Sequence, residues 1–228
     1  KNGFVLSGTT YDAYPNNTAF GGYIFGLDEN GNYDASDVGL DSEGFIASGE
    51  WLDGMIKDGL LPQSTDWDTA HVLFETGDVP FLMAGPWAVD RLNESGVAYK
   101  CGAFPDAGGP FLGVQGFMVN ALSENKLLAE TFLTEFVATE ETMQALSDAG
   151  NRPSAYTPVF EAIEEGTVLH DFAQATLDAQ PMPAIPEMAA VWDAWANGIT
   201  LIINQELTPE EALGDAAQQV RDIIEEGS

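Results

Sequence analysis

The stretch FLMAGPWAVDRL, residues 81–92, joins an apolar segment to a helix-like one through Gly85 and Pro86. The apolar run before this junction, residues 79–84, is short enough to form a buried strand. Proline suits the first position of a helix, because the N–H that it lacks would have no partner there. Trp87 follows at once, so a large ring is expected at the carboxyl end of a strand, where α/β sheets bind ligands. Packing in the core is the alternative for this side chain.

The composition of the chain excludes several classes of function. No apolar run approaches the roughly 20 residues of a membrane-spanning helix, and the first residues show no signal peptide. The 37 acidic and 7 basic residues give a net charge of −30, so nucleic acid would be repelled and is not expected as a partner. We expect a strongly solvated surface, with a high-salt habitat or a cationic ligand as alternative causes of the excess charge.

Strand-like segments are scattered among more numerous helical ones, in a chain long enough for one large domain or two lobes. The pair Asn30-Gly31 favours a hairpin turn over a calcium-binding loop, because Gly39 stands where such a loop needs a glutamate. This order predicts a helix-rich α/β or α+β fold. The strand-like segments are 20–27, 79–84 and two pieces within 99–122, and the helical ones are 41–58, 69–75, 123–138, 139–149, 168–179, 187–204 and 208–224.

The sequence lacks the common signatures of enzymes, since G-x-S-x-G, H-E-x-x-H, Walker A and G-x-G-x-x-G are all absent. Acid pairs such as Asp66 and Asp68 leave a glycosidase mechanism open, but 37 carboxylates supply such pairs by chance. The chain has only two histidines, His71 and His170, and the single Cys101 cannot form an internal disulfide. We therefore predict no catalytic residue, metal ion or cofactor.

Aromatic residues gather at three breaks in the predicted elements, and each has core packing as its alternative role. Sugars present flat apolar faces and a rim of hydroxyl groups, which aromatic rings and short polar groups can satisfy. Together the three segments predict a carbohydrate site. The residues are Trp87 after Gly-Pro, Trp192 and Trp195 three apart on one helical face, and Tyr11, Asp12 and Tyr14 in the loop-like segment TTYDAYPNNTAFGGY, residues 9–23.

Four segments, in this order along the chain, resemble the extracellular solute-binding proteins of ABC transporters, and among them the maltose/maltodextrin-binding type. They are GGYIFGLDENGNYDASDVGLDSEG (21–44), FETGDVPFLMAGPWA (74–88), FLGVQGFMVNALSENKLLAETFLTEFVATEETMQAL (111–146) and MPAIPEMAAVWDAWANGI (182–199). The resemblance implies an α/β fold of the periplasmic-binding-protein-like type II, with sugar held between two lobes that close by a hinge. It implies delivery of an oligosaccharide to an ABC importer without catalysis. A carbohydrate-active enzyme, and a binding protein for a peptide or cationic solute, are the alternatives.

The same resemblance implies which side chains hold the ligand. Trp87 and Trp192 match stacking tryptophans, and Tyr11 matches a tyrosine of the early cleft segment. Trp195, Asp12 and Tyr14 are candidates beside them, and Gln115 and Arg152 lie in segments that approach the cleft in relatives. This chain departs from the maltodextrin pattern at Asp12, at Thr9 or Thr10 and at Ala196. An oligosaccharide other than a maltodextrin is therefore an alternative ligand.

The resemblance also implies a division of the chain into lobes. Residues 1–102 and 156–228 would belong to the carboxyl-terminal lobe, and residues 103–155 would return to an amino-terminal lobe. Members of the family begin with a signal or lipid anchor and most of the first lobe, so an extracellular or periplasmic, membrane-anchored precursor is implied. Apolar faces of 103–155 would lack neighbours, and we expect a missing amino-terminal segment or a second copy to cover them.

Overall fold

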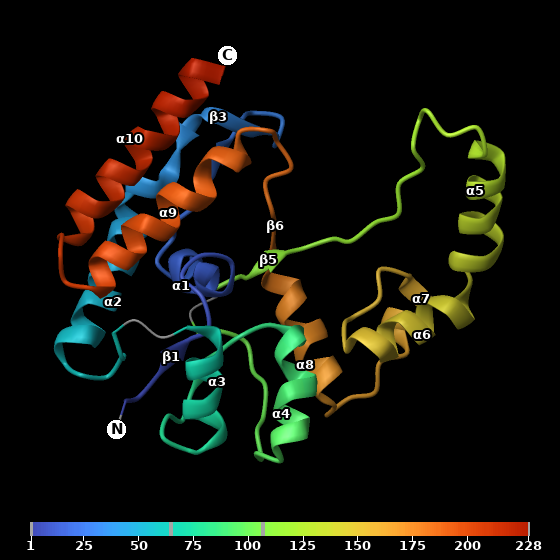
Figure 1. Ribbon diagram of the computed structural model, residues 1–228, viewed down its shortest axis with the longest axis horizontal. Helices are drawn as coiled ribbons and strands as arrows, with labels where there is room; N and C mark the ends of the chain where they lie inside the picture. Colours follow the sequence, from blue (N-terminus) through green and yellow to red (C-terminus); the bar gives the residue numbers. More distant parts are fainter. Residues whose placement is uncertain (1, 64–65, 106–107, 228) are drawn as a thin grey trace.

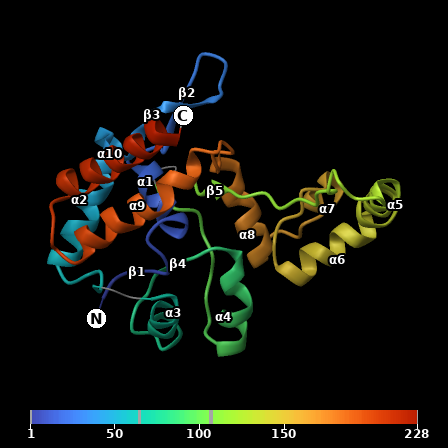
Figure 2. The ribbon, with the colours of Figure 1, turned by 45° about the horizontal axis from the view of Figure 1, so that its top comes forward.

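The computed structural model describes residues 2–63, 66–105 and 108–227. It shows a body and an arm that stands away from it in both ribbon views (Figure 1, Figure 2). The body contains both ends of the described chain, and the arm is formed by the middle of the sequence. The arm comprises α5 (Lys126–Phe132), a π-helical turn η4 (Leu133–Val137), α6 (Glu140–Gly150) and α7 (Thr157–Glu161).

Helices dominate the core of the body. The long helices α9 (Met188–Ile203) and α10 (Pro209–Gly227) pack against each other, and α2 (Glu43–Lys57) packs on both. Ser42 caps α2 by accepting a hydrogen bond from the N–H of Phe45, and Gly59 follows the helix in the left-handed conformation that commonly ends helices. The core between these helices contains the fully buried Phe45, Leu52, Trp195, Ile202 and Leu213.

Three two-stranded sheets complete the body. β1 (Val5–Leu6) pairs in parallel with β4 (Leu82–Met83), and β5 (Phe111–Leu112) pairs in parallel with β6 (Gln180–Pro181). β2 (Phe25–Leu27) and β3 (Tyr33–Val38) form the antiparallel hairpin predicted at Asn30-Gly31, with Gly31 at a φ of 81°. The remaining elements are η1 (Tyr11–Ala13), α1 (Tyr14–Ala19), η2 (Gly39–Asp41), α3 (Trp67–Glu75), η3 (Pro86–Ala88), α4 (Val89–Ser95), α8 (Val168–Ala175) and η5 (Thr176–Asp178).

The strands are shorter than the sequence predicts, whereas the predicted helices are present. Only two residues of the apolar run 79–84 pair, and β5 is the only strand within the described part of 99–122. Residues 113–122 are drawn out without a partner strand among the described residues, and nearly all of them are exposed. A β-strand requires a neighbour to receive its hydrogen bonds, so the residue pattern alone does not produce one.

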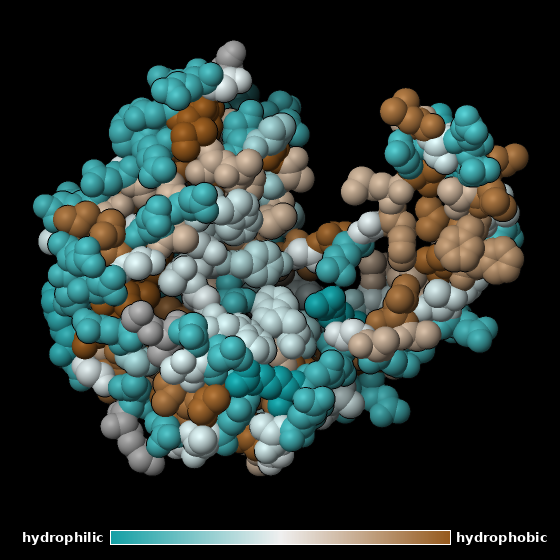
Figure 3. Space-filling view, viewed as in Figure 1, coloured by the Kyte–Doolittle hydropathy of each residue, from teal (hydrophilic) through white to brown (hydrophobic). Residues whose placement is uncertain are grey.

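The arm has almost no core of its own. Neither α5 nor η4 buries a residue, and Met118 in the segment leading to them is 95% exposed. Figure 3 shows apolar side chains gathered on this part of the molecule. The large apolar residues exposed between β5 and the end of α6 are Val114, Phe117, Met118, Leu122, Leu127, Leu128, Phe132, Phe136 and Leu146. Residues 108–112, by contrast, lie on the body, where Thr18 donates a hydrogen bond to the carbonyl of Gly109.

None of the helices in the described ranges combines the length and the apolar character that crossing a membrane requires.

Candidate ligand-binding site

Two parallel strands bring two of the predicted aromatic residues to one edge of the body. β1 and β4 run in the same direction, so the segments that follow them start side by side. The segment after β1 leads to Tyr11 in η1, and the segment after β4 passes Gly85 and Pro86 to Trp87 in η3. Pro86 occupies the first position of η3, as the sequence predicts. The carboxyl ends of parallel strands are the usual ligand-binding edge of α/β proteins.

Tyr11 lies at the centre of the aromatic cluster at this edge. Its ring centroid is 5.9 Å from Trp87, 6.5 Å from Trp192 on α9 and 5.3 Å from Phe111 on β5. Trp87 is 38% exposed, and Tyr11 and Trp192 are half-buried. The structure therefore brings together three rings that the sequence places far apart, and it leaves part of each ring accessible.

Two glycines allow the rings to lie close to the backbone. A Cβ atom on Gly85 would overlap the six-membered ring of Trp87, so this indole folds back over the backbone before it. A Cβ atom on Gly113 would overlap the hydroxyl of Tyr11 in the same way. The missing side chains of Gly85 and Gly113 leave the space that Trp87 and Tyr11 occupy.

Tyr14 and Trp195 do not reach the surface, which corrects their expected role as ligand contacts. Trp195 is fully buried, and Tyr14 is 5% exposed with its ring stacked on Phe111 at 3.7 Å. Burial raises the pKa of Tyr14 to about 12. Trp192 and Trp195 share a side of α9, with centroids 6.1 Å apart, but α9 faces the core on that side and only Trp192 reaches the rim. The two buried rings support the exposed ones.

Phe111 is a central residue of the cluster that sequence reasoning missed. It contacts the rings of Tyr11, Tyr14, Trp192 and Trp195. Its signal was present in the sequence, because Phe111 follows Gly-Gly-Pro just as Trp87 follows Ala-Gly-Pro.

Asp12 supplies a carboxylate directly beside the aromatic cluster. Its Oδ2 accepts a hydrogen bond of 3.0 Å from the hydroxyl of Ser7. Burial raises the pKa of Asp12, while this hydrogen bond and the charge of His71 lower it. The pKa of Tyr11 is likewise raised by burial and by Asp12, and it is lowered by Arg152.

Gln115 and Arg152 meet each other where the arm joins the body. Nη1 of Arg152 donates to Oε1 of Gln115 at 3.4 Å, and both side chains are exposed. The effect of Arg152 on the pKa of Tyr11 places its charge within electrostatic reach of the cluster. Gly113, two residues before Gln115, meets the hydroxyl of Tyr11, so the segment that carries Gln115 passes the rings and Arg152 contacts that segment.

Asp66 and Asp68, the acid pair considered for catalysis, both have structural roles. Asp66 caps α3 by accepting the N–H of Thr69 at 2.7 Å, and Asp68 forms an ion pair of 2.6 Å with Arg91. Within residues 2–63, 66–105 and 108–227, no three His, Cys, Asp or Glu side chains are grouped to hold a metal ion.

The helix-rich fold and the aromatic cluster are those expected of a solute-binding protein, and comparison with known proteins shows the family. A family model described as bacterial extracellular solute-binding protein matches residues 1–171. The chain belongs to this family, whose members are extracellular and bind solutes without catalysing a reaction.

Individual relatives agree with this assignment. The galactooligosaccharide-binding protein of Bacillus subtilis (strain 168) is 27% identical over 91% of this chain and 52% of its own length. A maltooligosaccharide ABC transporter solute-binding lipoprotein of Streptococcus pneumoniae (strain ATCC BAA-255 / R6) is 25% identical over 90% of this chain and 50% of its own length. The chain therefore spans about half the length of these relatives.

A solved structure confirms the predicted periplasmic-binding-protein-like fold. The crystal structure of a cyclo/maltodextrin-binding protein complexed with maltotetraose is similar with a TM-score of 0.86 and 27% sequence identity. The likeness covers 98% of this chain and 60% of that chain.

Proposed function

We propose that this chain is part of an oligosaccharide-binding protein that delivers its ligand to an ABC importer. The sugar lies against Tyr11, Trp87 and Trp192 and undergoes no reaction. The observation that carries the proposal is the convergence of these three partly exposed rings at one edge of the body. The relatives named for galactooligosaccharide and maltooligosaccharide support a sugar of more than one unit as the ligand.

The aromatic cluster suits a sugar because its rings are held before the ligand arrives. Tyr11 rests on Phe111, and Trp87 rests on the backbone at Gly85. A ring that is already fixed loses little conformational entropy on binding, so more of the stacking energy remains as affinity. Covering one ring face with apolar sugar surface contributes on the order of 1–3 kcal/mol.

Polar groups around the rings complete the proposed site. Asp12 accepts hydrogen bonds, Arg152 donates them, and the amide of Gln115 does both. A carboxylate, a guanidinium and an amide around stacked rings match a ligand with many hydroxyl groups. The positive charge of Arg152 would repel a cationic ligand. Asp66 caps α3 and Asp68 is paired with Arg91, which argues against a glycosidase that uses these two carboxylates.

The arm agrees with the proposed division into lobes in part, because α7 (Thr157–Glu161) also belongs to the arm although it follows residue 155. We assign residues 1–102 and 156–228 to one lobe and 103–155 to a segment that returns to the other, with 108–112 still lying over the body. The exposed apolar side chains of the arm would be covered by the rest of a longer protein or by a second copy. A membrane-anchored precursor is in line with the lipoprotein among the relatives.

Calorimetry with maltotetraose and with a galactooligosaccharide mixture tests the proposed function. We expect saturable binding of at least one of them, and no release of shorter sugars after prolonged incubation. A thermal-shift screen with amines and short peptides serves as the comparison. Stabilisation by these solutes but by no sugar would overturn the proposal, and sugar hydrolysis would replace it with an enzyme.

A further inference from the structure

A pocket of about 150 Å³ lies on the body between α9 and the segment that follows β1. It is distinct from the aromatic cluster, whose three partly exposed rings are not among its lining residues. Its base is apolar and consists of the buried side chains of Leu6, Leu61 and Ile203. Such a base suits the apolar face of a small ligand group.

The rim of this pocket carries polar groups that are open to hydrogen bonding. Thr200 is exposed, and its hydroxyl donates to the carbonyl of Ala196 at 2.7 Å, which leaves its oxygen to accept. Asn204 is also exposed, and its amide donates one hydrogen bond of 3.1 Å to Glu206. The hydroxyl of Thr9 has no hydrogen-bond partner among the described residues. The rim therefore offers both donors and acceptors to a ligand.

The charge of the lining narrows the class of ligand. Within the described ranges no charged residue lines the pocket, although the chain carries 37 acidic and 7 basic residues. A charged ligand group would lose water here without gaining a partner of opposite charge. An apolar base with hydroxyl and amide groups around it suits an uncharged group with many hydroxyls, which is the chemistry of a sugar unit.

Helix α9 joins the pocket to the aromatic cluster. Trp192, Ala196 and Thr200 are spaced by four residues, so they follow one another along one side of the helix, and all three are accessible. The distance from the first to the third along the helix axis is about 12 Å. Ala196 between them carries only a methyl group, so no long side chain separates the two sites. Both ribbon views show α9 crossing the body from the side nearest the arm toward α2 (Figure 1, Figure 2).

The segment after β1 makes the same connection on the other side. Thr9 lines the pocket, and Tyr11 follows two residues later with its ring 6.5 Å from Trp192. The pocket and the rings are therefore bounded by the same two pieces of chain. A ligand that lies along α9 from the rings reaches the pocket without crossing another element.

We propose that this pocket is a second sugar subsite, which binds a further unit of an oligosaccharide that extends from the aromatic rings over Ala196. The inference rests on the proposed function and adds the length of the ligand to it. A disaccharide on the rings leaves the pocket empty. A longer, uncharged oligosaccharide fills both places and is held more tightly.

Calorimetry with sugars of different length tests this inference. The titrated sugars are maltose and maltotetraose, with galactobiose and galactotetraose in parallel. In the native protein we expect the tetrasaccharide of at least one series to bind about tenfold more tightly than its disaccharide, because only the longer chain reaches the pocket.

Two changes at Thr200 reduce this preference to different extents. Thr200→Val keeps the shape of the side chain but deletes its hydroxyl, so the preference should fall roughly threefold. Thr200→Met places a longer side chain over the pocket and should bring the two affinities close together. Thr131→Met is the matched control and should keep the native preference, because the exposed Thr131 of α5 likewise donates to the carbonyl four residues before it, at 2.8 Å.

A second measurement locates the additional sugar units. The methyl NMR signals of Leu61 and Ile203 are expected to shift with the tetrasaccharide and to stay in place with the disaccharide. Equal native affinities for the two lengths, the native preference retained in Thr200→Met, or unchanged Leu61 and Ile203 signals would each overturn this inference alone. Absence of binding by all four sugars would overturn the proposed function, and this inference with it.

Discussion

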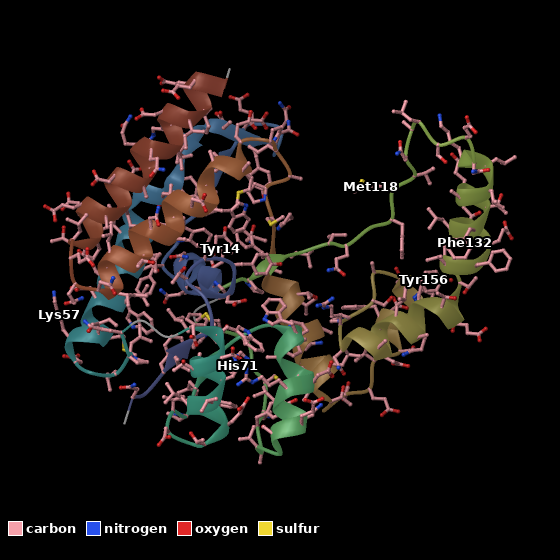
Figure 4. All side chains as sticks on the ribbon, in the orientation of Figure 1. Tyr14, Lys57, His71, Met118, Phe132 and Tyr156 are labelled. Atoms are coloured by element: carbon pink, nitrogen blue, oxygen red, sulfur yellow. The ribbon has the colours of Figure 1, made fainter. Side chains whose placement is uncertain are left out.

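The edge of the body and the arm both expose large apolar side chains, yet the two regions differ in what lies beneath them. At the edge, Trp87 lies over the backbone at Gly85, and Tyr11 lies against Phe111, which belongs to the hydrophobic core. On the arm, Phe132 and Phe136 are 56% and 63% exposed and stack on each other 6.1 Å apart, on elements that bury no residue. Figure 4 shows Phe132 and Met118 far from the body.

This difference separates a binding surface from an uncovered one. A ring held on a rigid support keeps its shape for a ligand, and its exposure is part of the site. A ring on a helix without a core gains from any apolar cover, which a protein surface supplies better than a sugar. The following changes test that distinction.

Trp195→Ala should have the largest effect, because it removes the ring that supports Tyr14 and Phe111. We expect the free energy of unfolding to fall by about 3–5 kcal/mol in urea titrations. Trp192→Ala, three residues earlier on the rim, should lower it much less. Equal losses for the two variants would show that the exposed rings are part of the core.

Trp87→Ala should act on binding instead of stability. Losing one stacking face is expected to weaken sugar binding roughly tenfold, or about 1–3 kcal/mol, while the urea midpoint changes little. Phe132→Ala removes an exposed ring from the arm, at 56% against 38% for Trp87, and is the control for calorimetry. A similar loss of sugar affinity in both variants would break the distinction between the two regions.

Gly85→Ala should weaken binding less than the loss of the indole, because the added methyl displaces the ring without deleting it. A few-fold weaker affinity and altered tryptophan fluorescence are expected. Gly54→Ala is the control, since a Cβ atom there meets nothing within 4 Å and should stabilise α2 by about 0.5–1 kcal/mol. Unchanged affinity in Gly85→Ala would contradict the proposed rest position of Trp87.

Asp12→Asn should stabilise the protein in a pH-dependent way. Burial raises the pKa of Asp12 above 3.8, so its ionisation costs folding free energy once the pH rises through the folded-state pKa. The variant is therefore expected to unfold at higher urea than the native chain at pH 7 and to lose this advantage near pH 3. A native chain that is more stable than the variant at pH 7 would reverse the assigned sign.

The double change Phe132→Ser and Phe136→Ser should have the smallest effect on stability, within about 0.5 kcal/mol, because nothing packs beneath these rings. Self-association in light scattering should nevertheless decrease if a second copy covers the arm. A clear loss of stability would show that the arm has a core after all.

Helices were predictable because their periodicity is a local property of the sequence. The predicted bounds 41–58, 187–204 and 208–224 lie close to those of α2, α9 and α10, and Pro86 marked the start of η3. Strands were less predictable, because pairing depends on a distant partner, and residues 113–122 have none among the described strands.

The aromatic residues show the same limit for the site. Sequence spacing places Trp192 and Trp195 on one side of α9, but only the packing of α2 and α10 decides which ring reaches the rim. Phe111 was missed because its neighbours come from segments far along the chain. The pocket at Thr200 was not predictable either, because its lining comes from segments far apart in the sequence.

One contact joins the two ends of the body into a cooperative unit. Arg221 of α10 donates hydrogen bonds to both carboxylate oxygens of Asp41 at 2.8 Å and to the carbonyl of Val38 at 3.0 Å. Such a bidentate bond is directional and strong, and it spans 180 residues of sequence. Fraying of the last helix inward past Arg221 would therefore also release the end of the hairpin, so this contact couples the opening of two segments far apart in the sequence.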